Sequence, residues 1–353
     1  MSHTRVVKVN PQKPEEKHLL AAADIIRDGG LVIVPTETVY GIAANSASAQ
    51  AIERLIRIKN RPQDKHFSVH IDEKEKLFLL AKDIPTSAFK LADRFWPGPL
   101  TMILRSPANG TIGVRLPDSG ITRRVIHLAD VPVVCPSANI SGRPAPVTVE
   151  DALADLDGKV DMALDAGRTR LGLESTVVDL TADPVRVLRE GALKEQEVLA
   201  AARKKTVLFV CTGNSCRSVM AEAMLKKYLK ERGRTDVEVI SAGLMKSEGM
   251  NASYPTQVLL RAEGIDVSGH RSHHATPELL NRSDLILVME EMHENEILLM
   301  APWVKKRLFL LKEFARVSDT DLNIPDPIGG SEEFYTHTFT IIKEAVQRVA
   351  QLV

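Results

Sequence analysis

The chain has 353 residues, 44% hydrophobic and 26% charged, which excludes a disordered chain and at this length predicts one large domain or two. Its 46 basic and 46 acidic residues cancel to a formal net charge of zero, which argues against a nucleic-acid-binding protein with a strongly basic surface. Three cysteines are too few for a disulfide framework, and the lack of a signal-peptide core or an apolar stretch of about eighteen residues predicts a soluble, cytoplasmic protein.

The first half of the chain alternates short β-branched runs with amphipathic stretches. The amphipathic stretches have apolar residues at i, i+3 and i+4, which predicts helices over 18–30, 48–60 and 86–95. The β-branched runs are bounded by Pro, Gly or Asp, which predicts strands at 31–35, 100–105, 112–117, 131–136 and 175–180.

A polar, helix-favouring run at 192–205 separates two segments that each begin with an apolar strand. We therefore predict a first domain at 1–195, a linker at 196–205 and a second domain at 206–353. Strands in the second domain are predicted at 206–210, 237–243, 285–289 and 307–311, with helices at 219–233 and around 256–264. This β–α–β rhythm indicates an α/β fold with a doubly wound parallel sheet.

The segment TVLFVCTGNSCRS, residues 206–218, is a strand that ends in a short loop and opens into a helix. Such a loop can wrap its N–H groups around a tetrahedral oxyanion at the positive end of the helix. Arg217 closes the ring with two donors, Ser218 can donate to the sulfur of Cys211, and Asn214 can brace the loop. Between Cys211 and Arg217 stand Thr212, Gly213, Asn214, Ser215 and Cys216. In this setting Cys211 is a thiolate able to attack phosphorus.

The alternative is a buried cysteine beside a surface arginine. The strand-to-helix position argues against it, and so does a possible general acid elsewhere in the chain. A phosphocysteine pathway needs a group that protonates the leaving atom and then activates water. Asp326 stands between two prolines in IPDPIGG (324–330), on a loop stiff enough to aim it.

Over 206–353 the chain resembles the low-molecular-weight protein tyrosine phosphatases. The resemblance rests on CTGNSCRS, SAG (241–243), GIDVSGHRS (264–272), DLILVM (284–289) and the late Asp-Pro. It implies that Cys211 is the nucleophile, Arg217 the phosphate clamp and Asp326 the general acid, with no cofactor or metal. Tyrosine-specific members carry a bulky apolar residue in place of Ser215 and an aromatic in place of Ile328. Phosphotyrosine and phosphoarginine both remain possible substrates.

Cys216, next to the proposed nucleophile, has two interpretations. It could form a reversible disulfide that shields Cys211 from overoxidation, or it could only fill space. Arsenate reduction on this fold relies on a further cysteine, and none follows Cys216.

Hydroxyl groups and two cations mark the first half. In PTETVYG (35–41) the hydroxyls of Thr36, Thr38 and Tyr40 share one face if the segment is extended. Lys59 and Arg61 lie two residues apart at the end of the predicted helix at 48–60, before Pro62, and could grip a polyphosphate, or could only be a solvated helix end.

Further short motifs follow in a fixed order. The loop PSANISGRPAP (136–146) can offer N–H and O–H donors to phosphate. The segments WPGPLT (96–101), TIGVRLP (111–117), ESTVVD (174–179) and VLREG (187–191) add Thr111, Arg115, Ser175 and Arg189. Each is ordinary alone, but together they resemble the YrdC-like threonylcarbamoyl-AMP synthases across about residues 10–195.

The YrdC-like resemblance implies an open α/β fold with a twisted sheet and a large, positively charged cavity. It implies a nucleotidyltransferase that condenses L-threonine, bicarbonate and ATP, with Mg²⁺ assisting, into threonylcarbamoyl-adenylate and pyrophosphate. Downstream tRNA-modification enzymes would accept the adenylate, and direct tRNA binding is not expected. The implied ATP-binding residues are Lys59, Arg61, Thr111, Ser137, Asn139 and Arg189, and the implied threonine-binding residues are Thr36, His70, Arg115 and Ser175.

Two alternatives stay open. The first domain could be mainly an RNA-binding module, although the chain is only 4% aromatic and has little to stack on bases. The second domain could be a catalytically silent phosphate sensor, although Cys211, Arg217 and Asp326 are all present.

Overall fold

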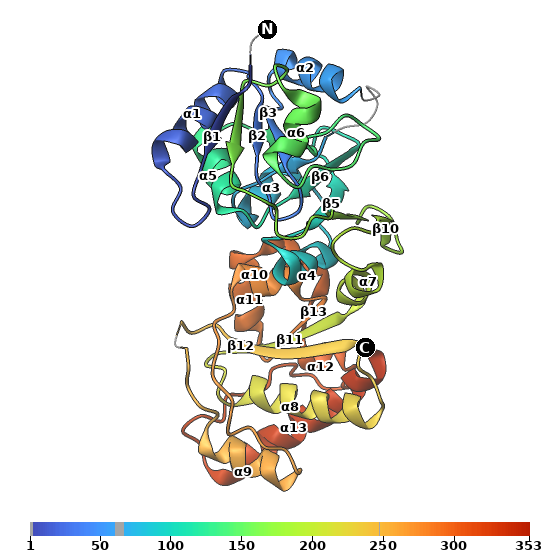
Figure 1. The fold of residues 1–353 in the computed structure, drawn as a ribbon. Helices are drawn as coiled ribbons and strands as arrows, with labels where there is room; N and C mark the ends of the chain where they lie inside the picture. The colour runs from blue at the N-terminus through green and yellow to red at the C-terminus, as the bar shows by residue number, and fades with distance from the viewer. Residues whose placement is uncertain (1–2, 61–66, 247) are drawn as a thin grey trace. The chain divides into compact units, whose positions relative to one another are not determined.

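The structure is a computed structural model that describes residues 3–60, 67–246 and 248–353. It divides into two compact units, Met1–Ala202 and Arg203–Val353 (Figure 1). No helix in the described part of the chain is long and apolar enough to cross a membrane.

The described residues of the first unit form a ten-stranded sheet in the order β1-β8-β2-β3-β7-β4-β6-β5-β9-β10. Parallel and antiparallel pairs both occur in it: β2 is antiparallel to β3 and parallel to β8. The strands are β1 Arg5–Lys8, β2 Val32–Val34, β3 Gly41–Asn45, β4 Val69–His70, β5 Leu100–Arg105, β6 Thr111–Arg115, β7 Val133–Val134, β8 Met162–Asp165, β9 Thr176–Asp179 and β10 Arg186–Arg189.

Helices cover both faces of this sheet, so its central strands are buried on two sides. Val32 and Val34 of β2 pack in the cluster under α1 and α5, which lie side by side, and Ile33 packs in the cluster on the opposite face (Figure 1). A strand buried on both faces reads as a continuous apolar run. The helices are α1 Glu16–Arg27, α2 Ala49–Lys59, η1 Lys74–Lys76, α3 Leu77–Leu80, α4 Thr86–Phe95, α5 Gly120–Ala129, α6 Val149–Leu156 and α7 Glu195–Arg203.

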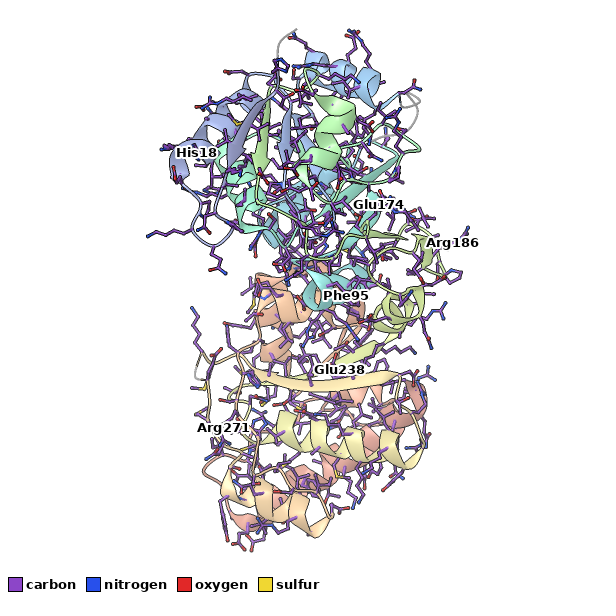
Figure 2. All side chains as sticks on the ribbon, viewed as in Figure 1. His18, Phe95, Glu174, Arg186, Glu238 and Arg271 are labelled. Atoms are coloured by element: carbon purple, nitrogen blue, oxygen red, sulfur yellow. The ribbon has the colours of Figure 1, made fainter. Side chains whose placement is uncertain are left out.

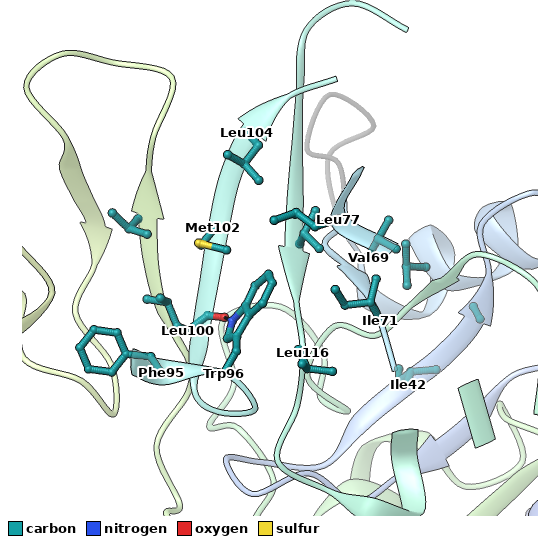
Figure 3. Close-up of a cluster of buried hydrophobic side chains, with 14 of the residues drawn as sticks. Ile42, Val69, Ile71, Leu77, Phe95, Trp96, Leu100, Met102, Leu104 and Leu116 are labelled. Carbon is teal, nitrogen blue, oxygen red and sulfur yellow. Dashed lines mark hydrogen bonds between the residues drawn. The ribbon is translucent and has the colours of Figure 1, made fainter. Parts of the chain in front are cut away.

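The larger of the two clusters shows how the sheet is anchored. Leu100, Met102 and Leu104 alternate along β5 and point into it (Figure 3). The Trp96 ring lies against the same cluster, and its Nε1–H donates to the carbonyl of Leu100 at 2.8 Å. The indole therefore buries its apolar body without leaving its polar atom unpaired.

The predicted helices and longer strands of the first unit agree with the structure in type, and α4 begins and ends where it was predicted. The predicted linker is part of a helix: α7 begins at Glu195, and its residues Val198, Ala201 and Ala202 are buried in the first unit's core. The segment 35–40 is not extended but bends, so its hydroxyls do not form a row.

The described residues of the second unit form a four-stranded, fully parallel sheet in the order β12-β11-β13-β14. Its elements are β11 Lys205–Cys211, α8 Arg217–Glu231, β12 Val237–Gly243, α9 Tyr254–Ala262, α10 Pro277–Arg282, β13 Leu285–Val288, α11 Glu291–Met300, η2 Pro302–Arg307, β14 Leu308–Leu310, α12 Leu311–Phe314 and α13 Glu332–Leu352. The prediction of an α/β fold with a doubly wound parallel sheet is confirmed.

The position of strand β11 in the sheet indicates where the second unit can hold a ligand. Val207 and Phe209 pack on the face covered by α8 and α13, whereas Leu208 and Val210 pack on the face covered by α10 and α11. The chain leaves β11 to one side for β12, and the partner on the other side is β13. Ligand crevices of open parallel sheets form at such a switch point, at the carboxyl ends of the strands. Cys211 is the last residue of β11.

Candidate active sites

Cys211 ends β11, Arg217 begins α8, and the loop between them lies at the positive end of the helix. Within the loop, the Sγ atom of Cys211 lies 3.0 Å from Oγ of Ser218. Both side chains are buried. The hydroxyl can therefore donate to a thiolate, which is the arrangement predicted from the sequence.

Arg217 is almost fully buried, with 1% of its surface exposed. Its Nη1 donates to Oε2 of Glu290 and, at 2.8 Å, to the carbonyl of Ile324. Its Nη2 donates to Oδ2 of Asp326 at 2.6 Å and to Oγ1 of Thr212 at 3.1 Å. Within the described residues Nε has no hydrogen-bond partner. The guanidinium is thus fixed on one side, and Nε is left for a phosphoryl oxygen.

Asn214 braces the loop. It is completely buried, has a left-handed backbone (φ 52°) and donates from Nδ2 to Ser218 (2.9 Å) and Ser241 (2.8 Å). Its Oδ1 accepts from the N–H of His273, and its carbonyl lies 2.8 Å from Nε2 of His270. Asparagine tolerates the left-handed conformation better than most residues, so one residue meets both the steric and the hydrogen-bonding demand.

We expect Asn214→Ala to lower the free energy of unfolding of the second unit by about 2–4 kcal/mol, because several buried groups lose their partners at once. Hydrogen exchange of peptides from 206–353 in urea measures this loss. Asn251→Ala is the matched control, because Asn251 is exposed. Equal stability of the two variants would contradict a bracing role.

The thiol of Cys216 lies among polar groups. Its Sγ lies 3.2 Å from Oγ of Ser253 and 3.5 Å from the hydroxyl of Tyr335. Neither Cys211 nor Cys216 is in a disulfide. The redox role of Cys216 stays a prediction.

Ser215 and Ile328, the two positions at which tyrosine-specific relatives differ, are both accessible to solvent. Ser215 is partly exposed, and Ile328 is 64% exposed two residues after Asp326. A β-carbon built on Gly213 would lie 3.7 Å from Oγ of Ser215 and 3.9 Å from Sδ of Met245. The Ser215 hydroxyl therefore lies next to Gly213 within the loop.

The first unit contains a cavity of about 280 Å³. Seven of the residues predicted to bind substrates line it: Thr36, Lys59, His70, Arg115, Ser137, Ser175 and Arg189. Among the described lining residues three are cationic, and one, Glu174 (labelled in Figure 2), is a carboxylate. The cavity is therefore suited to anionic ligands.

Lys59 joins α2 to the loop at 136–146. It is the last residue of α2 and is buried, and its Nζ donates to the carbonyl of Ser137 (2.6 Å) and to Oδ1 of Asn139 (2.9 Å). Lys59, Ser137 and Asn139 therefore meet at one edge of the cavity. Arg61 lies outside the described residues.

Arg115 has a buried partner that sequence reasoning missed. Its Nη2 donates to Oε1 of Glu37 at 2.7 Å and to Oγ1 of Thr38 at 2.8 Å. Glu37 also accepts from the N–H of Asp118 at 3.0 Å. The only sequence signal was an acidic residue inside an otherwise uncharged, buried segment. This ion pair fixes the guanidinium at the cavity wall.

Ser175 and Arg189 form the opposite wall. Arg189 donates from Nη2 to the carbonyl of Ser175 at 2.8 Å and from Nη1 to Oε1 of Glu174 at 3.0 Å. The hydroxyl of Ser175 lies 2.9 Å from Oγ1 of Thr101. The ESTVVD and VLREG segments are therefore brought together as antiparallel strands β9 and β10.

His70 lines the cavity with both ring nitrogens unpaired within the described residues. Burial, and then the charge of Arg115, lower the pKa of His70 to about 3, so the ring is neutral at physiological pH. A buried polar group without a partner is costly. The ring is therefore placed to hydrogen-bond a ligand that enters the cavity.

Three hydroxyl residues noted in the sequence are placed differently from the prediction. Thr36 lines the cavity, but its hydroxyl bonds locally, to the carbonyl of Val39 at 2.6 Å. The Tyr40 hydroxyl donates away from it, to the carbonyl of Gly167. Thr111 is exposed at the start of β6 and is not among the residues that line the cavity.

The first unit thus holds a cavity lined by cationic side chains, and the second a loop that joins Cys211 to Arg217 at the start of a helix. A family described as "Telomere recombination" (Sua5, YciO and YrdC) matches residues 24–191, and the family of low molecular weight phosphotyrosine protein phosphatases matches 206–353. The chain belongs to both families, one in each half. The two resemblances noted in the sequence are thus confirmed.

Individual relatives agree with this assignment. The threonylcarbamoyl-AMP synthase of Pyrococcus abyssi is 43% identical over 53% of this chain and 58% of its own length. The protein-arginine-phosphatase of Geobacillus stearothermophilus is 37% identical over 41% of this chain and 93% of its own. The crystal structure of P. abyssi Sua5 complexed with L-threonine has a TM-score of 0.54 at 29% identity, covering 87% of this chain and 99% of that one. The chain therefore spans about three fifths of the P. abyssi synthase sequence.

Proposed function

We propose that the protein is bifunctional. The first unit forms threonylcarbamoyl-adenylate from L-threonine, bicarbonate and ATP, and the second hydrolyses phosphorylated protein side chains. Each unit holds its own anion-binding site on its own sheet, and this observation carries the proposal. We propose that both reactions take place in the cytoplasm, where downstream tRNA-modification enzymes would accept the adenylate.

The cavity of the first unit supports the synthase reaction. The carbamate formed on the threonine amine is a weak and unstable nucleophile, so it must be held against the α-phosphorus away from bulk water. Lys59 would neutralise phosphate charge as pyrophosphate leaves. Arg115, fixed by Glu37, faces the cavity as a partner for the threonine carboxylate. The P. abyssi relative was crystallised with L-threonine, which favours this substrate.

Mg²⁺ fits this cavity as a companion of ATP. Mg²⁺ is usually held by one or two carboxylates together with substrate phosphates. The described lining offers one carboxylate, Glu174, which would share the ion with the phosphate oxygens. The ion would offset negative charge that develops on the leaving pyrophosphate.

The decisive experiment for the first unit is a pyrophosphate-release assay on the full chain with no RNA present. We expect release from ATP that depends on both L-threonine and bicarbonate. A protein that binds RNA but releases no pyrophosphate would favour the RNA-binding alternative and contradict the proposal.

The second unit supports phosphoryl transfer through cysteine. The Cys211 sulfur attacks phosphorus, the S–P bond forms, and the bond from phosphorus to the leaving oxygen or nitrogen breaks. Asp326 gives its proton to the leaving atom and then takes one from the water that hydrolyses the phosphocysteine. Arg217 and the loop N–H groups stabilise the charge on the phosphoryl oxygens throughout.

Phosphoarginine is the better-supported substrate. Ser215 at the loop entrance is small and polar, so it can hydrogen-bond a guanidinium but gives little apolar surface to a phenyl ring. The residue after the Asp-Pro pair, Ile328, is aliphatic and mostly exposed, so it gives no aromatic wall. The G. stearothermophilus relative bears the name of an arginine phosphatase, which points the same way.

We expect Ser215→Ile to shift the ratio of kcat/KM toward phosphotyrosine over phosphoarginine by about tenfold or more, because an apolar contact replaces a hydrogen-bonding group. Side-by-side assays on phosphotyrosine and phosphoarginine peptides measure the ratio. Ser215→Thr keeps the hydroxyl and is expected to keep the wild-type ratio. An unchanged ratio in Ser215→Ile would remove the reason to favour phosphoarginine.

A further inference from the structure

His293 lies behind the phosphate loop, in the first turn of α11, and is completely buried. Its Nδ1 accepts a hydrogen bond from the N–H of Glu290 at 3.1 Å. A neutral imidazole carries one proton, so this proton is on Nε2. The Nε2 atom lies 2.9 Å from Oγ1 of Thr212, to which it donates.

The hydroxyl of Thr212 receives a second donor. Nη2 of Arg217 lies 3.1 Å from the same oxygen. Two donors use both of the oxygen's lone pairs, so the hydroxyl keeps only its own proton to donate. Among the described residues this hydroxyl makes no other hydrogen bond. Thr212 follows Cys211 directly and shares Nη2 of Arg217 with Asp326. Its O–H group can therefore donate a hydrogen bond beside the phosphoryl site.

The charge state of His293 agrees with this arrangement. Burial, and then the nearby Arg217, lower the pKa of His293 to about 4. The groups that face the ring are Arg217, Glu290 and Asp326, together with Thr212. The neutral ring therefore persists at the pH at which a cytoplasmic enzyme works.

We propose that His293 is a positioning residue that holds the Thr212 hydroxyl so that its proton is donated to an oxygen of the bound phosphoryl group. The inference rests on the proposed phosphatase function and deepens it. Thr212 then adds a side-chain donor to the backbone N–H groups of the loop. His293 itself touches neither the substrate nor the reacting sulfur.

The two ring nitrogens can be replaced one at a time. In His293→Asn the amide oxygen stands near the position of Nδ1, so Glu290 keeps its acceptor but Thr212 loses its donor. In His293→Gln the longer amide reaches the position of Nε2, so Thr212 keeps a donor. We expect His293→Asn to lower kcat/KM for p-nitrophenyl phosphate about tenfold, as the loss of one hydrogen bond implies, and His293→Gln to stay within about threefold of wild type. The reverse order would show that His293 only caps the helix, and would overturn the proposal.

Thr212→Val removes the hydroxyl at a partly exposed position and keeps the proposal testable if His293→Asn does not fold. We expect it to lower kcat/KM and weaken orthovanadate binding, measured by calorimetry on the full chain, by about ten- to a hundredfold. The double variant Thr212→Val/His293→Asn should lose no more than Thr212→Val alone, because both act through one hydroxyl. Wild-type binding by Thr212→Val, or additive losses, would overturn the inference.

The orthovanadate measurement separates the two proposals. A wild-type chain that binds orthovanadate but hydrolyses neither phosphoesters nor phosphoarginine contradicts the phosphatase function, while the order of variant affinities still decides the role of His293. A wild-type chain that hydrolyses p-nitrophenyl phosphate, with Thr212→Val unaffected, contradicts the role of His293 alone.

Discussion

Cys211→Ser is expected to abolish hydrolysis of p-nitrophenyl phosphate, with a fall in kcat of at least about 10⁴-fold. A serine hydroxyl in place of the sulfur stays protonated, and the structure offers it Ser218 as a hydrogen-bond donor rather than a base. The remaining groups, Arg217 and the loop N–H groups, can still bind phosphate. The variant should therefore bind orthophosphate while failing to turn over, which steady-state kinetics and calorimetry together would show.

Cys216→Ser is the matched control, because it removes a thiol from the same loop. Its Sγ contacts Ser253 and Tyr335, so we expect activity within a few-fold of wild type under reducing conditions. Equal losses in the two variants would mean that Cys211 has no special role. Residual activity of Cys211→Ser near the wild-type level would remove the phosphocysteine mechanism.

Lys59→Ala is expected to lower threonine-dependent pyrophosphate release by at least about 10²–10³-fold, as the loss of a preorganised cation at a leaving phosphate implies. It removes the only described link from α2 to the carbonyl of Ser137 and the side chain of Asn139. Phosphatase activity should not change, because that site is built entirely from residues of the second unit. Both activities can be measured on one preparation.

Arg57→Ala tests whether any cation on α2 would serve. Arg57 lies two residues earlier on the same helix, is mostly exposed and pairs with Glu53, so we expect wild-type synthesis from this variant. Loss of both activities in Lys59→Ala would contradict independent sites. Unchanged synthesis in Lys59→Ala would remove Lys59 from the ATP site.

The helices and strands were predictable from the sequence where a periodic or apolar pattern continues over many residues. The period-3.6 pattern of α4 and the apolar run of β11 are continuous, and both elements were found in place. Strand β4 has two residues, too few to show any period, and its pairing depends on partners far along the chain. The strand predicted at 131–136 was found, but only as the two residues of β7. The segment 196–205 was predicted as a linker because the run around it is polar, but Val198, Ala201 and Ala202 are buried on one side of α7.

The phosphate loop was predictable for a related reason: all of its chemistry lies within residues 211–218. The residues that orient it do not. Glu290 is 73 positions from Arg217, and His293 is 81 from Thr212. In the first unit, Glu37 is likewise 78 positions from Arg115. Each pairing exists only once the sheet has brought distant strand ends together, so no local pattern could indicate it.

The contact between Asp326 and Nη2 of Arg217 has a consequence for the catalytic cycle. With no substrate bound, a carboxylate already occupies part of the guanidinium that a phosphoryl group must take. An arriving phosphate monoester or phosphoramidate has to displace the Asp326 carboxylate from Nη2 of Arg217. The displaced carboxylate is then no longer held by the guanidinium, and once protonated it can give that proton to the departing atom. Binding of the substrate to Arg217 and the departure of Asp326 from Arg217 are thus one step.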